Sequence, residues 1–178
     1  MRIIGVIAVA LTVTLLSTPR VGAQQLDAPH REVWQTVEAR WRAWQTGDLQ
    51  KMLTLYHPQF HAWNRVSGRL DDHAALLTRW TNALNSEKIV DVKLEPITVE
   101  LYGDFAAAFY VSRETVKQMP ATGTGEQGRT VAEPTVVTIR WSDYLVKVRG
   151  RWLFIGYSGL ACSQSEPAGS ACRGPDGK

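Results

Sequence analysis

The stretch from Arg40 to Phe60, RWRAWQTGDLQKMLTLYHPQF, decides the fold. Its first residues continue a helical stripe of apolar side chains that begins upstream, and Gly47 ends that helix. Asp48 is placed to cap a second, shorter helix, which Pro58 ends because proline has no backbone N–H to donate. The stretch therefore predicts two helices that meet at a tight turn.

A second stretch, SDYLVKVRGRWLFIGYSG from Ser142 to Gly159, predicts a β-hairpin. Branched and aromatic residues are frequent on both sides of Arg149-Gly150, which has the composition of a turn. We expect strands over 135–148 and 151–158, followed by an irregular tail.

The residues between these two stretches change from a helical to an alternating period. Asp71 or Asp72 can cap a third helix, and Asn85 offers it a left-handed end. Alternation from residue 90 onwards predicts further strands, with a bulge or a sheet edge at Pro96. The order predicts an α+β class, a cone-shaped domain of three N-terminal helices packed on a strongly curved antiparallel sheet. Such a sheet, wrapped around a long helix, would leave a cavity at its open end.

The first 23 residues have the pattern of a secretory signal peptide, with Arg2 before an apolar run and Val21-Gly22-Ala23 at the cleavage site. The apolar run is shorter than the roughly 20 residues that a membrane-spanning helix needs. We therefore expect an exported protein, periplasmic or secreted, with one domain over 24–160 and no membrane attachment after cleavage.

The tail over 161–178 contains both cysteines of the chain, Cys162 and Cys172. An even pair in an exported protein is expected to be oxidised, so the sequence predicts a disulfide that staples the tail.

The charge of the chain argues against a nucleic-acid partner. The sequence has 20 Lys and Arg residues, of which Arg2 and Arg20 leave with the signal peptide, so 18 remain against 17 Asp and Glu. The mature protein is near neutral, and its basic residues are scattered rather than clustered.

In this order and spacing, the motifs resemble the nuclear transport factor 2-like superfamily, in its SnoaL-like and ketosteroid-isomerase-like branch. The resemblance covers residues 31–158, nearly the whole expected domain. It rests on the Gly47-Asp48 break, the Leu55-Tyr56-His57-Pro58-x-Phe60 segment, the turn and helix after Gly68, and the hairpin from Ser142-Asp143-Tyr144 to Gly150-x-Trp152.

The resemblance also implies where a reaction would take place. Members similar to the isomerase use a carboxylate base after the first strand, a tyrosine in the first helix and an acid on a late strand. This chain has Asn64, Arg40 and Asp143 at those positions. An amide does not abstract protons at neutral pH and a guanidinium stays charged, so Asp143 alone keeps the family chemistry. The resemblance thus implies a catalytic Asp143 as acid or hydrogen-bond donor, with Arg40 stabilising an anion.

Strand alternation places Asp143 on the same face as Ile139, Trp141 and Leu145, which are apolar. Burial on such a face raises the pKa of a carboxyl group. Two alternatives stay open: Asp143 pairs with Arg40 or another cation across the cavity, or Arg40 lies at the surface.

The expected function is binding of a small apolar or aromatic molecule in the cone cavity, with isomerase, cyclase or dehydratase activity left open. The alternative is a non-catalytic interaction module that forms a homodimer through the outer face of the sheet and has a vestigial cavity. The residues expected to line the cavity are Trp41, Tyr56, Trp63, Asn64, Phe109, Trp141 and Tyr157.

No sequence motif suggests a nucleotide, a flavin or a metal, so we expect no cofactor. His57 and His61 have the spacing of helical zinc ligands, but Pro58 between them prevents a helix. In extended chain the two would lie about 13 Å apart at ~3.3 Å per residue, too far to share one ion.

Overall fold

The computed structural model describes residues 26–64, 68–119 and 133–162. The predicted signal peptide at 1–23, Cys172 and nearly all of the expected tail lie outside these ranges. Within them, no helix combines the length and apolarity needed to cross a membrane. The elements in chain order are α1 (Ala28–Thr46), α2 (Leu49–Leu53), β1 (Ala62–Trp63), β2 (Leu70–Asp71), α3 (His73–Ser86), β3 (Glu87–Tyr102), β4 (Phe105–Gln118), β5 (Thr135–Val148) and β6 (Arg151–Cys162).

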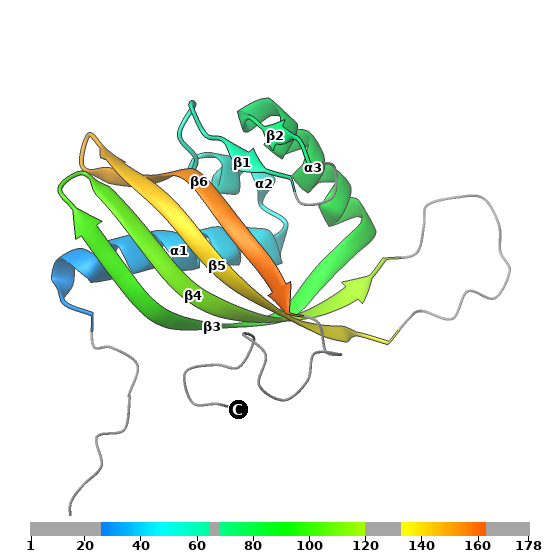
Figure 1. Cartoon of the computed structure of the whole chain (residues 1–178). Coiled ribbons are helices and arrows are strands. Elements are labelled where there is room, and N and C mark those ends of the chain that lie inside the picture. Colours follow the sequence, from blue (N-terminus) through cyan, green and yellow to red (C-terminus); the bar gives the residue numbers. More distant parts are fainter. Residues whose placement is uncertain (1–25, 65–67, 120–132, 163–178) are drawn as a thin grey trace, which may run out of the picture.

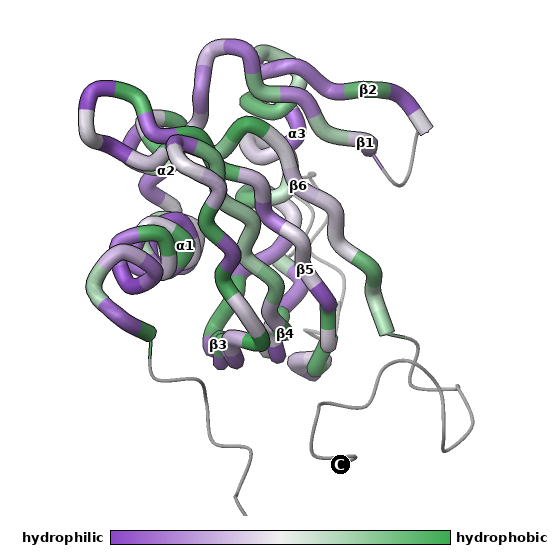
Figure 2. The backbone as a smooth tube through the Cα atoms, turned by 60° about the vertical axis from the view of Figure 1, so that its left-hand side comes forward, coloured by the Kyte–Doolittle hydropathy of each residue, from purple (hydrophilic) through white to green (hydrophobic). Residues whose placement is uncertain are grey.

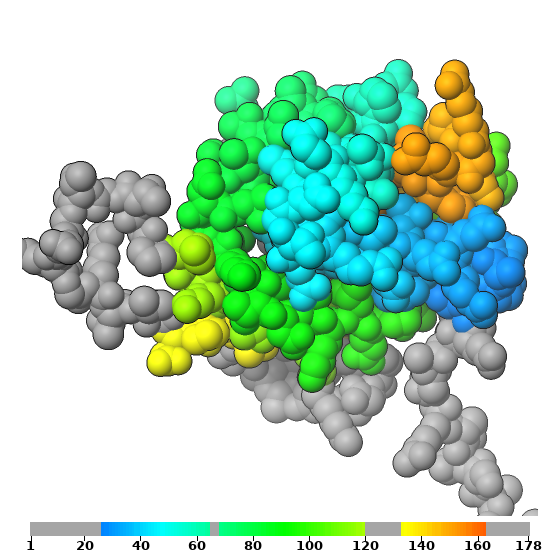
Figure 3. All heavy atoms as spheres, turned by 180° about the vertical axis from the view of Figure 1, so that it is seen from behind, coloured from blue at the N-terminus to red at the C-terminus, as the bar shows by residue number. Residues whose placement is uncertain are grey.

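The predicted α+β cone is confirmed. A four-stranded antiparallel sheet has the order β3-β4-β5-β6, and β1 and β2 form a separate two-stranded ribbon. Helix α1 lies across one face of the curved sheet, and α3 lies at one end of it, near β1 and β2 (Figure 1). Seen from the side, α1 forms its own layer beside the strands (Figure 2). From behind, α1 and α2 cover this face of the sheet (Figure 3).

The core lies between α1 and the inner face of the sheet. The buried stripe of α1 includes Val33, Trp34 and Val37, as its helical spacing predicts. On β4 the small side chains of Ala106 and Ala108 are fully buried and let the helix approach the sheet. The ring of Trp34 packs edge-on against Tyr110 of β4, with centroids 5.4 Å apart.

The helix boundaries follow the predicted capping residues, with one exception. Gly47 ends α1 in the left-handed conformation, and the Asp48 carboxylate accepts a hydrogen bond from the Lys51 N–H at 2.9 Å. Of the two candidates for capping α3, Asp72 does so. The predicted left-handed end at Asn85 is wrong: α3 continues through Ser86 and passes directly into β3, because Glu87 already has extended backbone angles.

The register of the described strands shifts at three places, two between β3 and β4 and one between β5 and β6. The register of β3 against β4 shifts between Pro96 and Thr98, which confirms the predicted bulge, and β3 is an edge strand. The shift between β5 and β6 leaves Ile155 without a partner in the ladder. Because of it, Phe154 and Tyr157 both belong to the inner face. The expected end of β6 at 158 is wrong, since β6 pairs with β5 as far as Cys162.

Replacing Gly47 tests the turn that sets the helices at an angle. Its φ of 69° is costly for a residue with a Cβ, so we expect Gly47→Ala to lower the free energy of unfolding by about 1 kcal/mol. Gly47→Asn is the matched control and should lose clearly less, because asparagine tolerates this conformation. Urea unfolding followed by tryptophan fluorescence measures both, and equal losses would contradict the explanation.

Candidate functional site

A buried ion pair joins α1 to the sheet. Arg40 is 3% exposed and its Nη1 lies 3.1 Å from Oδ1 of Asp143 on β5, which is fully buried. The hydroxyl of Tyr110 on β4 donates to Asp143 Oδ2 at 2.8 Å and accepts hydrogen bonds from Arg40 Nη2 and, at 3.0 Å, from Trp41 Nε1. Both oxygens of Asp143, both terminal nitrogens of Arg40 and the Tyr110 hydroxyl therefore have hydrogen-bond partners.

Aromatic rings surround the guanidinium group. Its central carbon lies 4.7 Å from the ring centroid of Phe154 and 5.4 Å from those of Trp41 and Trp141. Tyr157 is slightly farther, at 5.8 Å. Arginine is suited to this environment because its planar, weakly hydrated cation stacks on aromatic faces.

Burial has opposite effects on the groups of this cluster. It raises the pKa of the Asp143 carboxyl above its usual range, and the Arg40 charge and the Tyr110 hydrogen bond oppose that rise. For Arg40, burial is the largest single influence and lowers the pKa, but the Asp143 carboxylate together with the neighbouring tyrosines outweighs it and raises that pKa, so Arg40 stays charged. Burial also raises the pKa of Tyr110, whose hydroxyl remains protonated and can donate.

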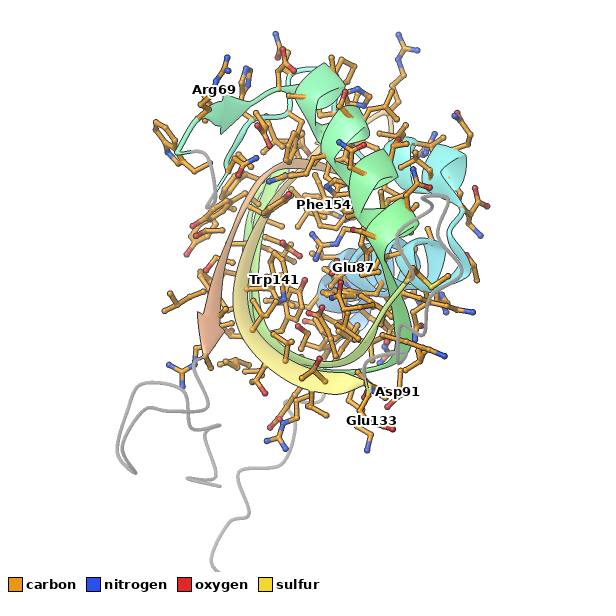
Figure 4. All side chains as sticks on the ribbon, turned by 90° about the vertical axis from the view of Figure 1, so that its right-hand side faces the viewer. Arg69, Glu87, Asp91, Glu133, Trp141 and Phe154 are labelled. Atoms are coloured by element: carbon orange, nitrogen blue, oxygen red, sulfur yellow. The ribbon has the colours of Figure 1, made fainter. Side chains whose placement is uncertain are left out.

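A cavity of about 210 Å³ opens next to this cluster, between α1, α3 and the sheet. Figure 4 looks along the curved sheet, with Trp141 and Phe154 in the space that the sheet encloses and Glu87 on the side of α3. Five aromatic residues line the cavity: Trp41, Trp44, Trp80, Trp141 and Tyr157. Its charged lining residues are Arg40, Arg79, Glu87 and Glu114.

Trp141 is held in place by contacts on several sides. Its partner across the strands is Gly159, and a Cβ added there would lie 2.7 Å from the indole ring, so only glycine leaves room for it. Its Nε1 donates to the Ser112 hydroxyl at 2.8 Å, and Ser112 donates to Glu114. The ring also meets Trp41 edge-on, with centroids 5.8 Å apart.

A second ion pair lies on the other side of Tyr157. Arg79 on α3 has its Nη1 3.1 Å from Asp71 Oδ2, and it donates from Nη2 to the Tyr157 hydroxyl. The side-chain amide of Asn64 donates to the same Asp71 oxygen at 3.2 Å. The β1–β2 ribbon is thereby connected to α3 and to the edge of the cavity.

Of the residues predicted for the cavity, Arg40, Trp41, Trp141 and Tyr157 line it. Asp143 lies behind this lining, and its two oxygens bind Arg40 and Tyr110, which is the ion-pair alternative left open by the sequence.

The other predicted lining residues lie elsewhere. Tyr56 is buried in the core, with its ring 5.2 Å from that of Phe154. Trp63 is 67% exposed, because its neighbour Ala62 takes the inward position of β1. Phe109 belongs to the outer face, since Ala108 and Tyr110 on either side of it point inward. Asn64 reaches Asp71 instead of the cavity.

Sequence reasoning missed Arg79, Glu87 and Glu114 as lining residues. Glu114 has the same alternation parity as Tyr110 and Ser112 on β4, so strand parity could have indicated that it points inward. Trp44 and Trp80 have the helical spacing of buried residues, and this spacing does not distinguish the core from the wall of a cavity. Among the described residues, no three His, Cys, Asp or Glu side chains group in a way that could hold a metal ion.

The buried pair predicts a large effect on stability. Asp143→Asn leaves the Arg40 charge buried without a carboxylate and should lower the free energy of unfolding by roughly 3 kcal/mol. The double variant Arg40→Met with Asp143→Leu should lose less, because no unpaired charge remains. Glu32→Gln is the surface control: it breaks an exposed pair with Lys147 and should change stability by less than about 1 kcal/mol. Chemical denaturation measures the free energy of unfolding of each variant. A double variant that is less stable than Asp143→Asn would contradict this explanation.

The fold is found in several solved structures. The first is a ketosteroid isomerase-like protein from Erwinia carotovora atroseptica, with a TM-score of 0.63 and 15% identity, over 78% of this chain and 99% of that one. A nuclear transport factor 2-like protein from Cytophaga hutchinsonii has a TM-score of 0.59 and 12% identity, over 76% of this chain and 100% of that one. A putative calcium/calmodulin-dependent kinase II association domain from Exiguobacterium sibiricum also has a TM-score of 0.59, with 14% identity over 80% and 99% of the two chains. At these identities the likeness shows the fold alone.

The amino-acid sequence gives the family. A comparison with curated proteins gave no match. Residues 37–146, however, match the SnoaL-like domain, and this range includes α1 from Val37 onward, both ion pairs and most of the sheet. The chain therefore belongs to the SnoaL-like domain family, as the sequence motifs predicted.

Proposed function

We propose that the protein binds a small, flat, apolar or aromatic molecule in the cavity at the open end of the cone. The observation that supports this most directly is the lining, in which four tryptophans and Tyr157 surround about 210 Å³ of open space. Protein sites for small molecules combine such apolar walls with a few polar groups. The volume is modest: an apolar cavity of about 150 Å³ binds benzene, so this one suits one ring or two fused rings.

The proposal is for binding rather than turnover. The Asp143 carboxylate uses both oxygens for Arg40 and Tyr110, and none of its surface is exposed. A general acid or base has to reach its substrate within hydrogen-bond distance, directly or through one water. If a carbonyl compound is converted in the cavity, Arg40 is the group placed on the lining to stabilise a developing negative charge, with Asp143 acting through it.

A matched pair of tryptophan variants tests the binding proposal. The purified protein is incubated with a library of small aromatic metabolites, and retained compounds are identified by native mass spectrometry after desalting. Trp141→Leu removes a ring of the lining and should weaken retention of any bound compound roughly fivefold, since ring contacts contribute on the order of 1 kcal/mol each. Trp63→Leu removes an exposed ring outside the cavity and should change nothing. No retained compound, or equal losses in both variants, would refute the proposal.

A second candidate function is self-association through the outer face of the sheet. Three aromatic residues form a row on this face near the turn between β3 and β4: Tyr102, Phe105 and Tyr144, with exposed fractions of 64%, 37% and 36%. Phe105 stacks on Tyr144 and meets Tyr102 at a tilt, with ring centroids 6.3 Å apart in both pairs. Exposed aromatic groups of this kind are frequent in protein interfaces. We propose that this face carries the homodimer contact.

If the outer face forms the homodimer contact, a charge introduced there should dissociate the dimer. Phe105→Glu places a charge in the middle of the stack and should convert dimer to monomer in sedimentation velocity experiments. Leu70→Glu, which adds the same charge to the exposed β2 ribbon, should leave the dimer intact. A wild-type protein that is monomeric at high micromolar concentration would exclude this candidate.

A further inference from the structure

The charged side chains that line the cavity differ in whether they form an ion pair with another residue. Arg40 is paired with the buried Asp143, and Arg79 with Asp71, which is 6% exposed. Glu87, in contrast, is half-buried and makes no ion pair with any residue in the described part of the chain. Burial raises the pKa of its carboxyl, and a hydrogen bond with Gln118 opposes this effect only in part. A positive charge in the cavity would stabilise the ionised form of Glu87.

The end of α3 adds to the negative potential at this position. The helix has 14 residues and no basic residue in its last turn. Its C-terminus therefore carries the negative end of the helix dipole without a compensating side chain. Ala83, whose carbonyl accepts the Glu87 N–H, and Glu87 itself both line the cavity. A cation bound there would meet both the carboxylate and the helix end.

Two rings of the lining, those of Trp44 and Trp80, have no cationic side chain of the described residues over them. Within the described residues, Arg40 lies over Trp41, Trp141, Phe154 and Tyr157, Arg79 over Tyr157, and Lys147 over Trp152. No such contact involves Trp44 or Trp80, whose rings meet edge-on with centroids 4.9 Å apart. Trp80 and Ala83 lie three residues apart on α3, Glu87 follows at the start of β3, and all three line the cavity, so the ring and the carboxylate both face it.

We propose that the cavity selects a positively charged ligand, an aromatic or apolar molecule bearing an ammonium group that binds between the Glu87 carboxylate and the rings of Trp44 and Trp80. The inference rests on the proposed function and adds the charge of the ligand to it. Aromatic faces beside a carboxylate are the usual protein environment for ammonium ions.

The two arginines do not favour an anion instead. Each already donates to a buried aspartate and to a tyrosine hydroxyl. A ligand carboxylate that took over either guanidinium would leave the aspartate charged, buried and unpaired, which is strongly unfavourable. The uncompensated charge of the lining is therefore the acidic one.

Three probes that share one ring test this inference by isothermal titration calorimetry at pH 7: 2-phenylethylamine, 2-phenylethanol and phenylacetate. They are cationic, neutral and anionic at this pH. We expect the amine to bind at least tenfold more tightly than the alcohol, and the acid to bind most weakly. If the alcohol binds as tightly as the amine, the charge inference fails while the proposed function stands. If none of the three binds, both fail.

Two variants, each of which removes one acidic charge, test whether the ammonium group binds at Glu87. Glu87→Gln keeps the size of the side chain and should weaken binding of 2-phenylethylamine roughly tenfold, because the amide oxygen that replaces the carboxylate is a neutral and weaker acceptor for an ammonium group, while 2-phenylethanol is unaffected. Glu95→Gln removes the same charge from the exposed outer side of β3 and should change neither affinity. An equal loss in both variants would mean that only the overall charge matters, and would overturn the site. Circular dichroism and the unchanged 2-phenylethanol affinity show that the Glu87 variant is folded.

Discussion

The structure depends on one buried contact, the ion pair between Arg40 and Asp143 with the Tyr110 hydroxyl between them. It joins α1, β5 and β4, so it fixes the position of the long helix against the curved sheet. Buried ion pairs add little net stability compared with apolar packing, because both charges lose their hydration. Their effect is to make other arrangements costly. Any shift of α1 along the sheet would separate the charges in an apolar interior.

The same contact determines what the cavity can do. In members similar to the isomerase, the late-strand acid faces the ligand. Here the acid, Asp143, forms an ion pair with Arg40 of α1. The cavity is therefore lined at this point by the paired Arg40 and by aromatic rings. The other charged groups of the lining come from α3, from the start of β3 and from β4: Arg79, Glu87 and Glu114.

Two stretches far apart in sequence meet on the other side of the core. Tyr56 forms a parallel bridge with Phe154, the His57 N–H donates to the Phe154 carbonyl, and the Phe154 N–H donates to Leu55, both at 2.8 Å. The segment that follows α2 is thus hydrogen-bonded to β6, a few residues after the turn at Gly47 and Asp48. These are the two stretches from which the sequence predicted the fold, and their pairing in space explains why both were informative.

Local rules predicted the helices, the turns, the bulge at Pro96 and the inward direction of Asp143, because capping, proline geometry and strand alternation act over a few residues. They did not predict the cavity wall equally well. Phe109 was expected to line the cavity, but the neighbouring Tyr110 is the residue that points inward on β4. Trp63 was expected to line it as well, but the neighbouring Ala62 is the buried residue of β1. Arg79 and Glu87 could not be assigned to the cavity before the angle of α3 against the sheet was known. That angle depends on tertiary contacts such as the edge-on packing of Trp44 and Trp80.

The direct passage from α3 into β3 limits how the cavity can change shape. With Ser86 the last helical residue and Glu87 the first of the strand, there is no loop between them to act as a hinge. A movement of α3 away from the sheet would therefore strain the first residue pairs of the β3–β4 ladder. Rotation of the indole side chains in the lining disturbs no backbone hydrogen bond, and it is the adjustment that this connection favours.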